Sequence, residues 1–273
     1  MAVELPAANA MIDIHHHCLP DVDDGPRGYD EAVEMLAMAA EEGIEAIVAT
    51  PHVLRGRWPA RSPRELEDRA QALREKTGNK PRLVLGSEYF FAHDMADVLE
   101  AGNAIVPLAG SRYVLLELAA NSVPPMFEQP LYRAQLAGWI PIIAHPERNL
   151  VFQSKPELLA ALIHHGARTQ ITVTSLLDAF GRDARVAAET FLRLGLVHFV
   201  ATDAHNTDKR PPRVKEGLST LRALTGDSVA EALSRHNPAA VIENRPLPFV
   251  PDPIDEKPAD GLFTRLRSFF RPR

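Results

Sequence analysis

The chain is short of cysteine, of long apolar runs and of positive charge, and each shortage excludes a class of protein. Its 273 residues include one cysteine, Cys18, so an internal disulfide framework is excluded. No apolar run is long enough to cross a bilayer. The net charge of −6 gives no general attraction to nucleic acid or anionic membrane. We therefore expect a globular protein that binds no nucleic acid and, without a secretory signal, resides in the cytoplasm.

The surroundings of Cys18 also exclude one kind of enzyme. Cysteine-dependent phosphatases need an arginine six positions after the nucleophile, in a loop whose backbone amides cradle phosphate. Here that position holds Asp24. Cys18 is therefore expected to be a small packing residue.

Strand-like and helix-like segments alternate along residues 11–245. The predicted strands are 11–15, 45–50, 82–86, 113–116, 140–144, 169–173 and 197–202. The predicted helices include 29–42, 63–76, 126–137, 156–164 and 184–194, which end near Gly43, Gly78, Gly138, Gly166 and Gly195. This repeated order predicts an α/β fold, and seven parallel strands with covering helices close most naturally into a (β/α)7 barrel.

The two ends of the chain differ from the predicted barrel. Residues 1–10 form an N-terminal extension, and residues 246–260 combine prolines with acidic residues, which is typical of an extended linker. Residues 261–273 place Leu262, Phe263 and Leu266 on one helical face among arginines. This basic amphipathic tail could dock on a membrane or a partner, pack on its own barrel, or stay disordered.

The segment Met11-Ile12-Asp13-Ile14-His15-His16-His17 predicts a strand that ends in metal ligands. Alternate residues of a strand point the same way, so His15 and His17 project together while His16 points elsewhere. Such a pair can chelate a metal, and the acidic residues that follow would recruit harder cations or bridge two metals. An expression tag or a polar surface strand is the alternative, but a tag normally lies at a terminus, without an apolar strand before it.

Other metal-binding residue types also follow predicted strands. Because sites in such barrels gather at the carboxyl ends of the strands, we expect these side chains to meet. They are His52, Glu88, Glu117, His145, Asp203 and His205, whereas His16, His93, His164, His165, His198 and His236 lie elsewhere and are left out. Glu88 and Glu117 end apolar segments, and metal would neutralise a buried carboxylate there. Each could instead be a solvated carboxylate at the end of a strand.

Two arginines follow these candidate ligands closely in the sequence. Arg148 lies three residues after His145, and Arg210 lies five residues after His205. A guanidinium beside a metal cluster indicates an oxyanion substrate, because its fork grips two phosphate oxygens while metals polarise the others. A phosphate ester is the expected substrate, although surface arginines are often simply solvated.

Taken together, these motifs resemble the PHP (polymerase and histidinol phosphatase) superfamily. Within it, Asp21-Val22-Asp23-Asp24-Gly25-Pro26, His145-Pro146-Glu147-Arg148 and Asp203-Ala204-His205-Asn206 resemble the bacterial capsule and exopolysaccharide protein-tyrosine phosphatases. The resemblance runs from about Met11 to Asn244 and implies a distorted seven-stranded barrel with a trinuclear site. Serine commonly stands in that family where this chain has His16, which would contact substrate or merely fill space.

The resemblance also implies how the ligands are shared among three divalent metals. One metal would be held by His15, His17, Glu88 and Asp203, a second by Glu88, Glu117 and His145, and a third by Asp24, His52 and His205. Manganese is the usual metal, with iron or zinc as alternatives. Arg148 and Arg210 would bind the phosphate.

The activity implied is hydrolysis of phosphotyrosine by a metal-activated hydroxide, on a membrane-bound tyrosine kinase of capsule or exopolysaccharide synthesis. Two alternatives stay open from the sequence. One is a small-molecule phosphoesterase such as a histidinol phosphatase. The other is a non-catalytic scaffold that metal stabilises and that acts in polysaccharide assembly.

Overall fold

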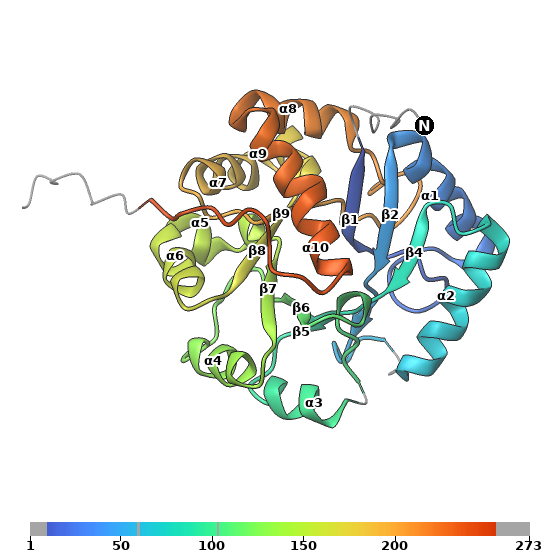
Figure 1. Cartoon of the computed structure of the whole chain (residues 1–273), viewed down its shortest axis with the longest axis horizontal. Coiled ribbons are helices and arrows are strands. Elements are labelled where there is room, and N and C mark those ends of the chain that lie inside the picture. The colour runs from blue at the N-terminus through green and yellow to red at the C-terminus, as the bar shows by residue number, and fades with distance from the viewer. Residues whose placement is uncertain (1–9, 59–60, 103, 255–273) are drawn as a thin grey trace, which may run out of the picture.

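Parallel strands lie at the centre of the molecule and helices surround them, as Figure 1 shows for the computed structural model. The structure describes residues 10–58, 61–102 and 104–254. The strands are β1 (Met11–His16), β2 (Ile44–Ala49), β3 (His52–Val53), β4 (Arg82–Leu85), β5 (Glu88–Phe90), β6 (Tyr113–Glu117), β7 (Ile140–Ala144), β8 (Arg168–Thr172) and β9 (Phe199–Ala201). All seven strands predicted from the sequence have a counterpart among them.

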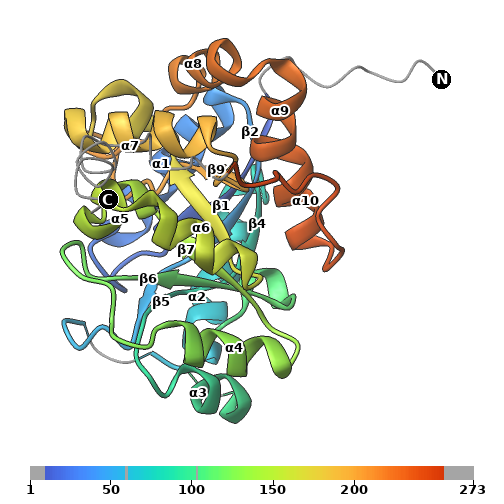
Figure 2. The ribbon, with the colours of Figure 1, turned by 90° about the vertical axis from the view of Figure 1, so that its left-hand side faces the viewer.

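Helices cover the outside of the strands, and the view in Figure 2 shows α3 and α4 gathered at one end of the molecule, away from α8. The helices are α1 (Gly28–Glu42), α2 (Pro63–Thr77), α3 (Met95–Ala101), α4 (Glu128–Leu136), α5 (Leu150–Ser154), α6 (Pro156–His164), α7 (Arg182–Arg193), α8 (Lys215–Thr225), α9 (Asp227–Glu231) and α10 (Asn237–Ile242). Short 3-10 turns follow β7 at Pro146–Arg148 and β8 at Val173–Leu177. The five helices expected from the sequence are confirmed.

Hydrogen bonds divide the strands into two parallel sheets. One has the order β1-β2-β4, and the other has the order β3-β5-β6-β7-β8-β9. A parallel bridge between His16 and Ala204 joins β1 to the segment after β9. The expected α/β class is confirmed, whereas a single closed seven-stranded barrel is not confirmed.

The second sheet begins where two strands break and resume. Pro51 follows β2 and has no amide hydrogen to continue the ladder. After β4, Gly86 lies so close to its neighbours that a Cβ there would approach Val48 and Leu108 to 2.9 and 2.8 Å. Beyond these breaks His52 and Glu88 pair in register as the first residues of β3 and β5. The breaks therefore place two candidate ligands side by side.

Successive side chains of the strands pack into two different hydrophobic clusters. Ile14, Leu115 and Ile142 belong to one cluster of buried residues. Their neighbours along the chain, such as Leu116 and Ile143, pack instead in the larger cluster that includes the inner faces of the helices. Both faces of these strands are apolar, as is usual for parallel sheets covered by helices.

The chain continues past α10 in contact with the rest of the fold. Ile254 donates a backbone hydrogen bond of 2.9 Å to Leu194, and Phe249 exchanges hydrogen bonds with the side chain of Asn237. The expected linker is thus packed on the domain over residues 246–254. Its remainder, the amphipathic tail and residues 1–9 of the expected extension lie outside the described residues. Within the described ranges, no helix has the length and apolarity to span a membrane.

Replacing His198 by glutamine should make the stability of the protein less sensitive to acid. Burial, with a smaller effect of Arg168, lowers the pKa of His198 from 6.5 to about 3. The unfolded chain therefore takes up a proton on this residue at a higher pH than the folded chain does. Stability is lost as the pH falls from 6.5 towards 3, by up to about 1.4 kcal/mol per pH unit.

Urea unfolding of parent and His198→Gln in chelator, across this pH interval, measures the effect. The free energy of unfolding of the parent should fall more steeply than that of the variant. A difference between the two proteins that does not change with pH would contradict the assignment.

Candidate metal centre

The candidate ligands meet at the carboxyl ends of the strands, around a cavity of about 230 Å³. Seven of them line it directly: Asp24, His52, Glu88, Glu117, His145, Asp203 and His205. The remaining two, His15 and His17, are fully buried beside Glu88 and Asp203. The structure thus brings the predicted side chains together, from segments as far apart in the chain as His15 and His205.

Four donor atoms form the innermost group. His15 Nε2 lies 3.3 Å from Asp203 Oδ1 and 3.4 Å from Glu88 Oε2. His17 Nε2 lies 3.3 Å from the same oxygen of Glu88 and 3.5 Å from that of Asp203. The two imidazole nitrogens are themselves 3.2 Å apart. Two nitrogens and two carboxylate oxygens thus face one point, as ligands of a single cation do.

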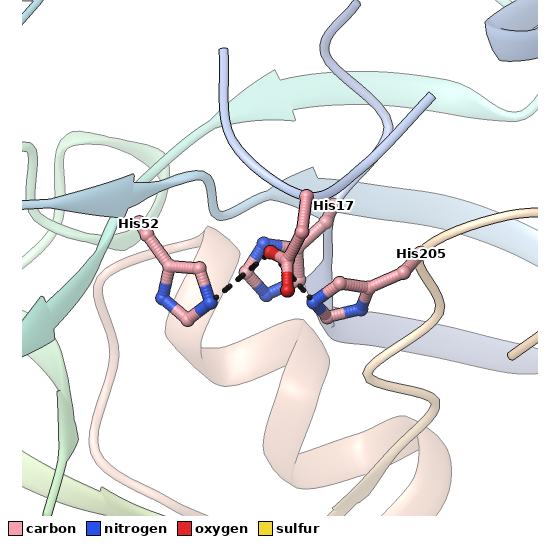
Figure 3. Close-up of side chains that lie close together, drawn as sticks. His17, His52 and His205 are labelled. Carbon is pink, nitrogen blue, oxygen red and sulfur yellow. Dashed lines mark ion pairs between the residues drawn. The ribbon is translucent and has the colours of Figure 1, made fainter. Parts of the chain in front are cut away.

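A second group of metal-binding side chains shares His17 with the first group. Figure 3 shows the rings of His17, His52 and His205 converging, with dashed lines marking the ion pairs to the carboxylate among them. That carboxylate is Asp24, whose Oδ1 lies 3.5 Å from His52 Nε2 and 3.4 Å from His205 Nε2. His17 stacks on His205 with ring centroids 3.9 Å apart. This group therefore contains His17 as well as the three residues expected from the resemblance.

Glu88 connects both groups to a third. Its Oε1 lies 3.0 Å from His145 Nε2, while its Oε2 lies 2.9 Å from His52 Nδ1. Glu117 approaches His52 Nδ1 to 3.6 Å, so it groups with His52 and Glu88 rather than with His145. The guanidinium of Arg55 lies 2.8 Å from Glu117 and 3.2 Å from His52 Nε2, so it adjoins both residues. Glu88 is thus the carboxylate best placed to bridge cations.

A layer of partners behind the histidines orients their rings. Nδ1 of His15 lies 2.8 Å from Gln170 Oε1, and Nδ1 of His17 lies 2.8 Å from Asp23 Oδ2. Nδ1 of His205 lies 3.0 Å from the Asp203 carbonyl. In each case Nε2 is the nitrogen left to face the cavity. Such partners fix the tautomer and strengthen metal binding.

The backbone around the centre is held in sparsely populated conformations. His145 directly follows β7, Asp203 comes two residues after the end of β9, and their φ angles are 32° and 52°. At Gly25, the residue after Asp24, a Cβ would lie 2.6 Å from the His17 carbonyl, so only glycine fits. Strain of this kind persists where the surrounding structure over-determines it and is common at functional sites.

The electrostatics of the cluster favour cations. Burial alone would raise the pKa of Glu88, but His15 and His52 outweigh it and hold that pKa well below its usual value. Burial also opposes charge on His17, yet Asp23 and Glu88 raise its pKa to about 10. The pKa of Glu117 shifts in the opposite direction to that of Glu88, because burial and the nearby charge of Glu88 raise it to about 7. Positive charge is therefore needed to keep these carboxylates ionised together.

The donor atoms fit divalent metal by a second criterion. Glu88 Oε2, Glu117 Oε2, His52 Nδ1 and His205 Nε2 are all buried and make no well-aligned hydrogen bond, although each has an ion-pair neighbour within 3.4 Å. Leaving a buried polar group unsatisfied costs about 1–3 kcal/mol. Ligation would satisfy all four atoms at once, because each points into the cluster. Mixed imidazole and carboxylate donors suit manganese, iron or zinc.

Two arginines form the adjoining wall of the cavity. Arg148 and Arg210 both pair with Oδ2 of Asp203, Arg148 at 2.6 Å, while Oδ1 of the same carboxylate faces His15 and His17. The guanidinium of Arg148 also donates to Thr172 and stacks on Phe180 at 3.4 Å. Asp203 therefore connects the arginines to the metal-binding groups. The sequence placed both arginines close to candidate ligands, but it did not predict that they would share one carboxylate.

Sequence reasoning missed several residues that support the centre. Asp23 stood in a recognised motif, but its pairing with His17 carried no signal of its own. Gln170 is a polar residue inside a predicted strand, which is a signal of a buried partner. Arg55 and Phe180 lie on loops, and the sequence around them gave no signal of a role in the site. His16 belongs to none of the candidate metal-binding groups of the described residues, and it is fully buried with neither ring nitrogen hydrogen-bonded.

Comparison with known proteins agrees with this arrangement. Residues 11–243 match the family model described as capsular polysaccharide synthesis, CpsB/CapC. The chain is 38% identical over 211 residues to a putative tyrosine-protein phosphatase CapC of Staphylococcus aureus, covering 76% of this chain and 81% of that protein. It is 33% identical over 256 residues to the tyrosine-protein phosphatase YwqE of Bacillus subtilis, covering 93% of this chain and 100% of YwqE.

A solved structure extends the comparison to the fold. It comes from work on YwqE of Bacillus subtilis and CpsB of Streptococcus pneumoniae, described as unique metal-dependent tyrosine phosphatases. The TM-score is 0.83 at 33% identity, over 89% of this chain and 99% of the other. The match therefore includes nearly all of the described elements.

Replacing Asp23 by asparagine should weaken the binding of divalent metal without unfolding the protein. Asp23 lies 2.8 Å from His17 Nδ1 and accepts a hydrogen bond from the His52 backbone, so it orients two candidate ligands. Loss of such a partner typically weakens metal affinity by about 10- to 100-fold. Calorimetric titration with Mn²⁺ measures the change.

Asp21→Asn is the matched control, because Asp21 lies in the same loop but is exposed and has a φ of 57°, which asparagine tolerates. This variant should keep the affinity of the parent. Equal Mn²⁺ affinity in the Asp23 variant and the parent would show that Asp23 does not position the ligands.

Proposed function

Because this chain belongs to the capsular polysaccharide synthesis family CpsB/CapC, we propose that it is a metal-dependent protein-tyrosine phosphatase. The observation that carries the proposal is the pairing of Arg148 and Arg210 with Asp203, on the wall of a cavity lined by histidines and carboxylates. Guanidinium groups beside bound cations are a combination suited to a phosphate monoester. Named tyrosine-protein phosphatases that the chain covers over their full length support the same activity.

We assign the ligands to three divalent metals, with manganese as the first expectation and iron or zinc as alternatives. His15, His17, Glu88 and Asp203 would hold one metal, Glu88, Glu117 and His145 a second, and Asp24, His52 and His205 a third. Glu117 groups with His52 in the structure, so its carboxylate would turn towards His145 to join the second metal. The buried donor atoms that make no hydrogen bond support a metal-binding role. Bound there, such ions would supply Lewis acidity and activate the attacking water.

The side chains around the ligands would bind and orient the phosphate. Arg148 and Arg210 present their guanidinium groups next to Asp203, and the ring of Phe180 lies 3.4 Å from Arg148. In this position the two arginines would hold phosphoryl oxygens and stabilise the negative charge that develops on them during hydrolysis. A phenolate leaves readily, so no residue is assigned as a general acid.

We propose further that the two sheets form the distorted (β/α)7 barrel of the PHP superfamily. The parallel bridge between His16 and Ala204, which brings β1 beside the end of β9, supports this closure. The substrate proposed is a membrane-bound tyrosine kinase of capsule or exopolysaccharide synthesis, met in the cytoplasm. The family's role in capsular polysaccharide synthesis supports this choice of partner.

Metal removal and the Arg148→Ala substitution should each abolish most of the hydrolysis of a phosphotyrosine peptide. Chelation removes the cations, whereas the substitution removes a donor to the transition state, which typically costs about 10²–10³ in turnover. Turnover with matched metal analysis of parent, chelated parent and variant measures both effects. Activity should return when Mn²⁺ is added back to the chelated parent.

Arg133→Ala is the control for Arg148→Ala, because Arg133 also pairs with an aspartate, Asp97, but at the exposed surface of α4. It should keep full activity. Undiminished hydrolysis by the Arg148 variant at parental metal content would refute the role given to that arginine. No hydrolysis by the metal-loaded parent would favour a non-catalytic scaffold instead.

A comparison of substrates separates the proposed activity from that of a small-molecule phosphoesterase. We expect kcat/KM to be higher for a phosphotyrosine peptide than for histidinol phosphate, because a phenolate is a better leaving group than an alkoxide. Steady-state kinetics of the manganese-loaded protein on both substrates provide the measurement. A strong preference for histidinol phosphate would overturn the substrate assigned.

A further inference from the structure

A second cavity adjoins the candidate metal centre behind Asp203 and Arg210. It has a volume of about 330 Å³, and these two residues line both cavities. Phe180 lines the second cavity as well, and its ring lies 3.4 Å from the guanidinium of Arg148 and 5.7 Å from that of Arg210. A single layer of side chains therefore separates the two cavities.

The second cavity carries positive charge that the described part of the chain does not neutralise. Lys209 and Arg213 line it, are exposed, and form no ion pair with any described residue. The carboxylate of Glu42 is already engaged, since it accepts hydrogen bonds from the backbone of Val214 and Lys215. Asp203 is paired with the two arginines of the metal centre, which leaves Glu216 as the other lining carboxylate.

Much of the remaining lining is apolar. Leu177, Phe180 and Pro211 contribute to it, next to the two unpaired cations. An occupant with an aliphatic stem and a negative end would suit such a surface, because the stem can pack on the apolar residues while the charge meets the cations. Glutamate and aspartate side chains have this character.

We propose that this cavity is a specificity subsite, which binds a carboxylate side chain of the substrate protein near the phosphotyrosine. The inference rests on the proposed function. Because Asp203 and Arg210 line both cavities, residues that flank a tyrosine bound in the metal cavity would lie within reach of the second cavity. An acidic flanking residue would find Lys209 and Arg213 there.

Two phosphotyrosine peptides that differ only in their flanking residues test the subsite. One carries glutamate on both sides of the phosphotyrosine, and the other carries glutamine. For the metal-loaded parent we expect kcat/KM to be about fivefold higher on the glutamate peptide, as for contacts to two partly exposed cations. The preference should shrink at high salt, because exposed charges are screened.

The double substitution Lys209→Ala and Arg213→Ala should remove this preference. Among the described residues, neither side chain forms a hydrogen bond or ion pair with a candidate ligand or with Arg148 or Arg210, so turnover of a small aryl phosphate should stay at the parental level. Arg82→Ala is the matched control, because Arg82 is an exposed cation at the start of β4, at the opposite end of the strand from the metal centre. It should keep the preference of the parent.

The outcomes separate this inference from the proposed function. No metal-dependent hydrolysis of either peptide by the parent would overturn the proposed function. Hydrolysis of both peptides with equal kcat/KM, or an unchanged preference in the double variant, would overturn the subsite alone. A preference lost in the double variant, with aryl phosphate turnover and thermal stability unchanged, would establish it.

Discussion

The structure depends on the concentration of carboxylates and imidazoles at one end of its strands. Glu88 and Asp203 are buried there; Glu88 lies within 3.5 Å of four histidines and Asp203 within 3.5 Å of two. Anionic groups so close together in a poorly hydrated place repel one another unless positive charge lies between them. Protonated histidine supplies part of that charge in the bare protein, and divalent cations would supply it better. The proposed activity is one consequence of this constraint.

Asp203 links the two halves of the centre. One of its oxygens faces His15 of β1 and the next alternate residue, His17, and the other receives both arginines. A single carboxylate therefore connects the histidines to the arginines. The backbone of Asp203 is left-handed, two residues after the end of the buried strand β9. The same residue, with Arg210, also forms the wall shared with the proposed subsite.

The strand breaks have a comparable role on the opposite side of the cavity. If β2 and β4 continued regularly, the alternation of side chains would carry on through His52 and Glu88 without interruption. The break at Pro51 and the tight contact at Gly86 let both strands resume in a second sheet, with His52 and Glu88 directly paired. The two strand breaks thus help to bring candidate ligands together in the site.

The sequence by itself predicted seven of the nine described strands, five of the ten described α-helices and the set of candidate ligands. It could do so because apolar periodicity marks buried strands, and because parallel strands in an α/β fold bring their carboxyl ends together. Residues such as His145 and Asp203 could be selected from their position alone.

Only the tertiary structure decided which donors share a group and which side chains stand behind them. The grouping of Glu117 with His52, the role of Arg55, the support of His17 by Asp23 and the cavity beside Lys209 all depend on contacts between loops. Loops carry no periodicity, and the distances between their side chains are set by packing of segments far apart in the chain. For the same physical reason, the division of the strands into two sheets could not be predicted from their spacing.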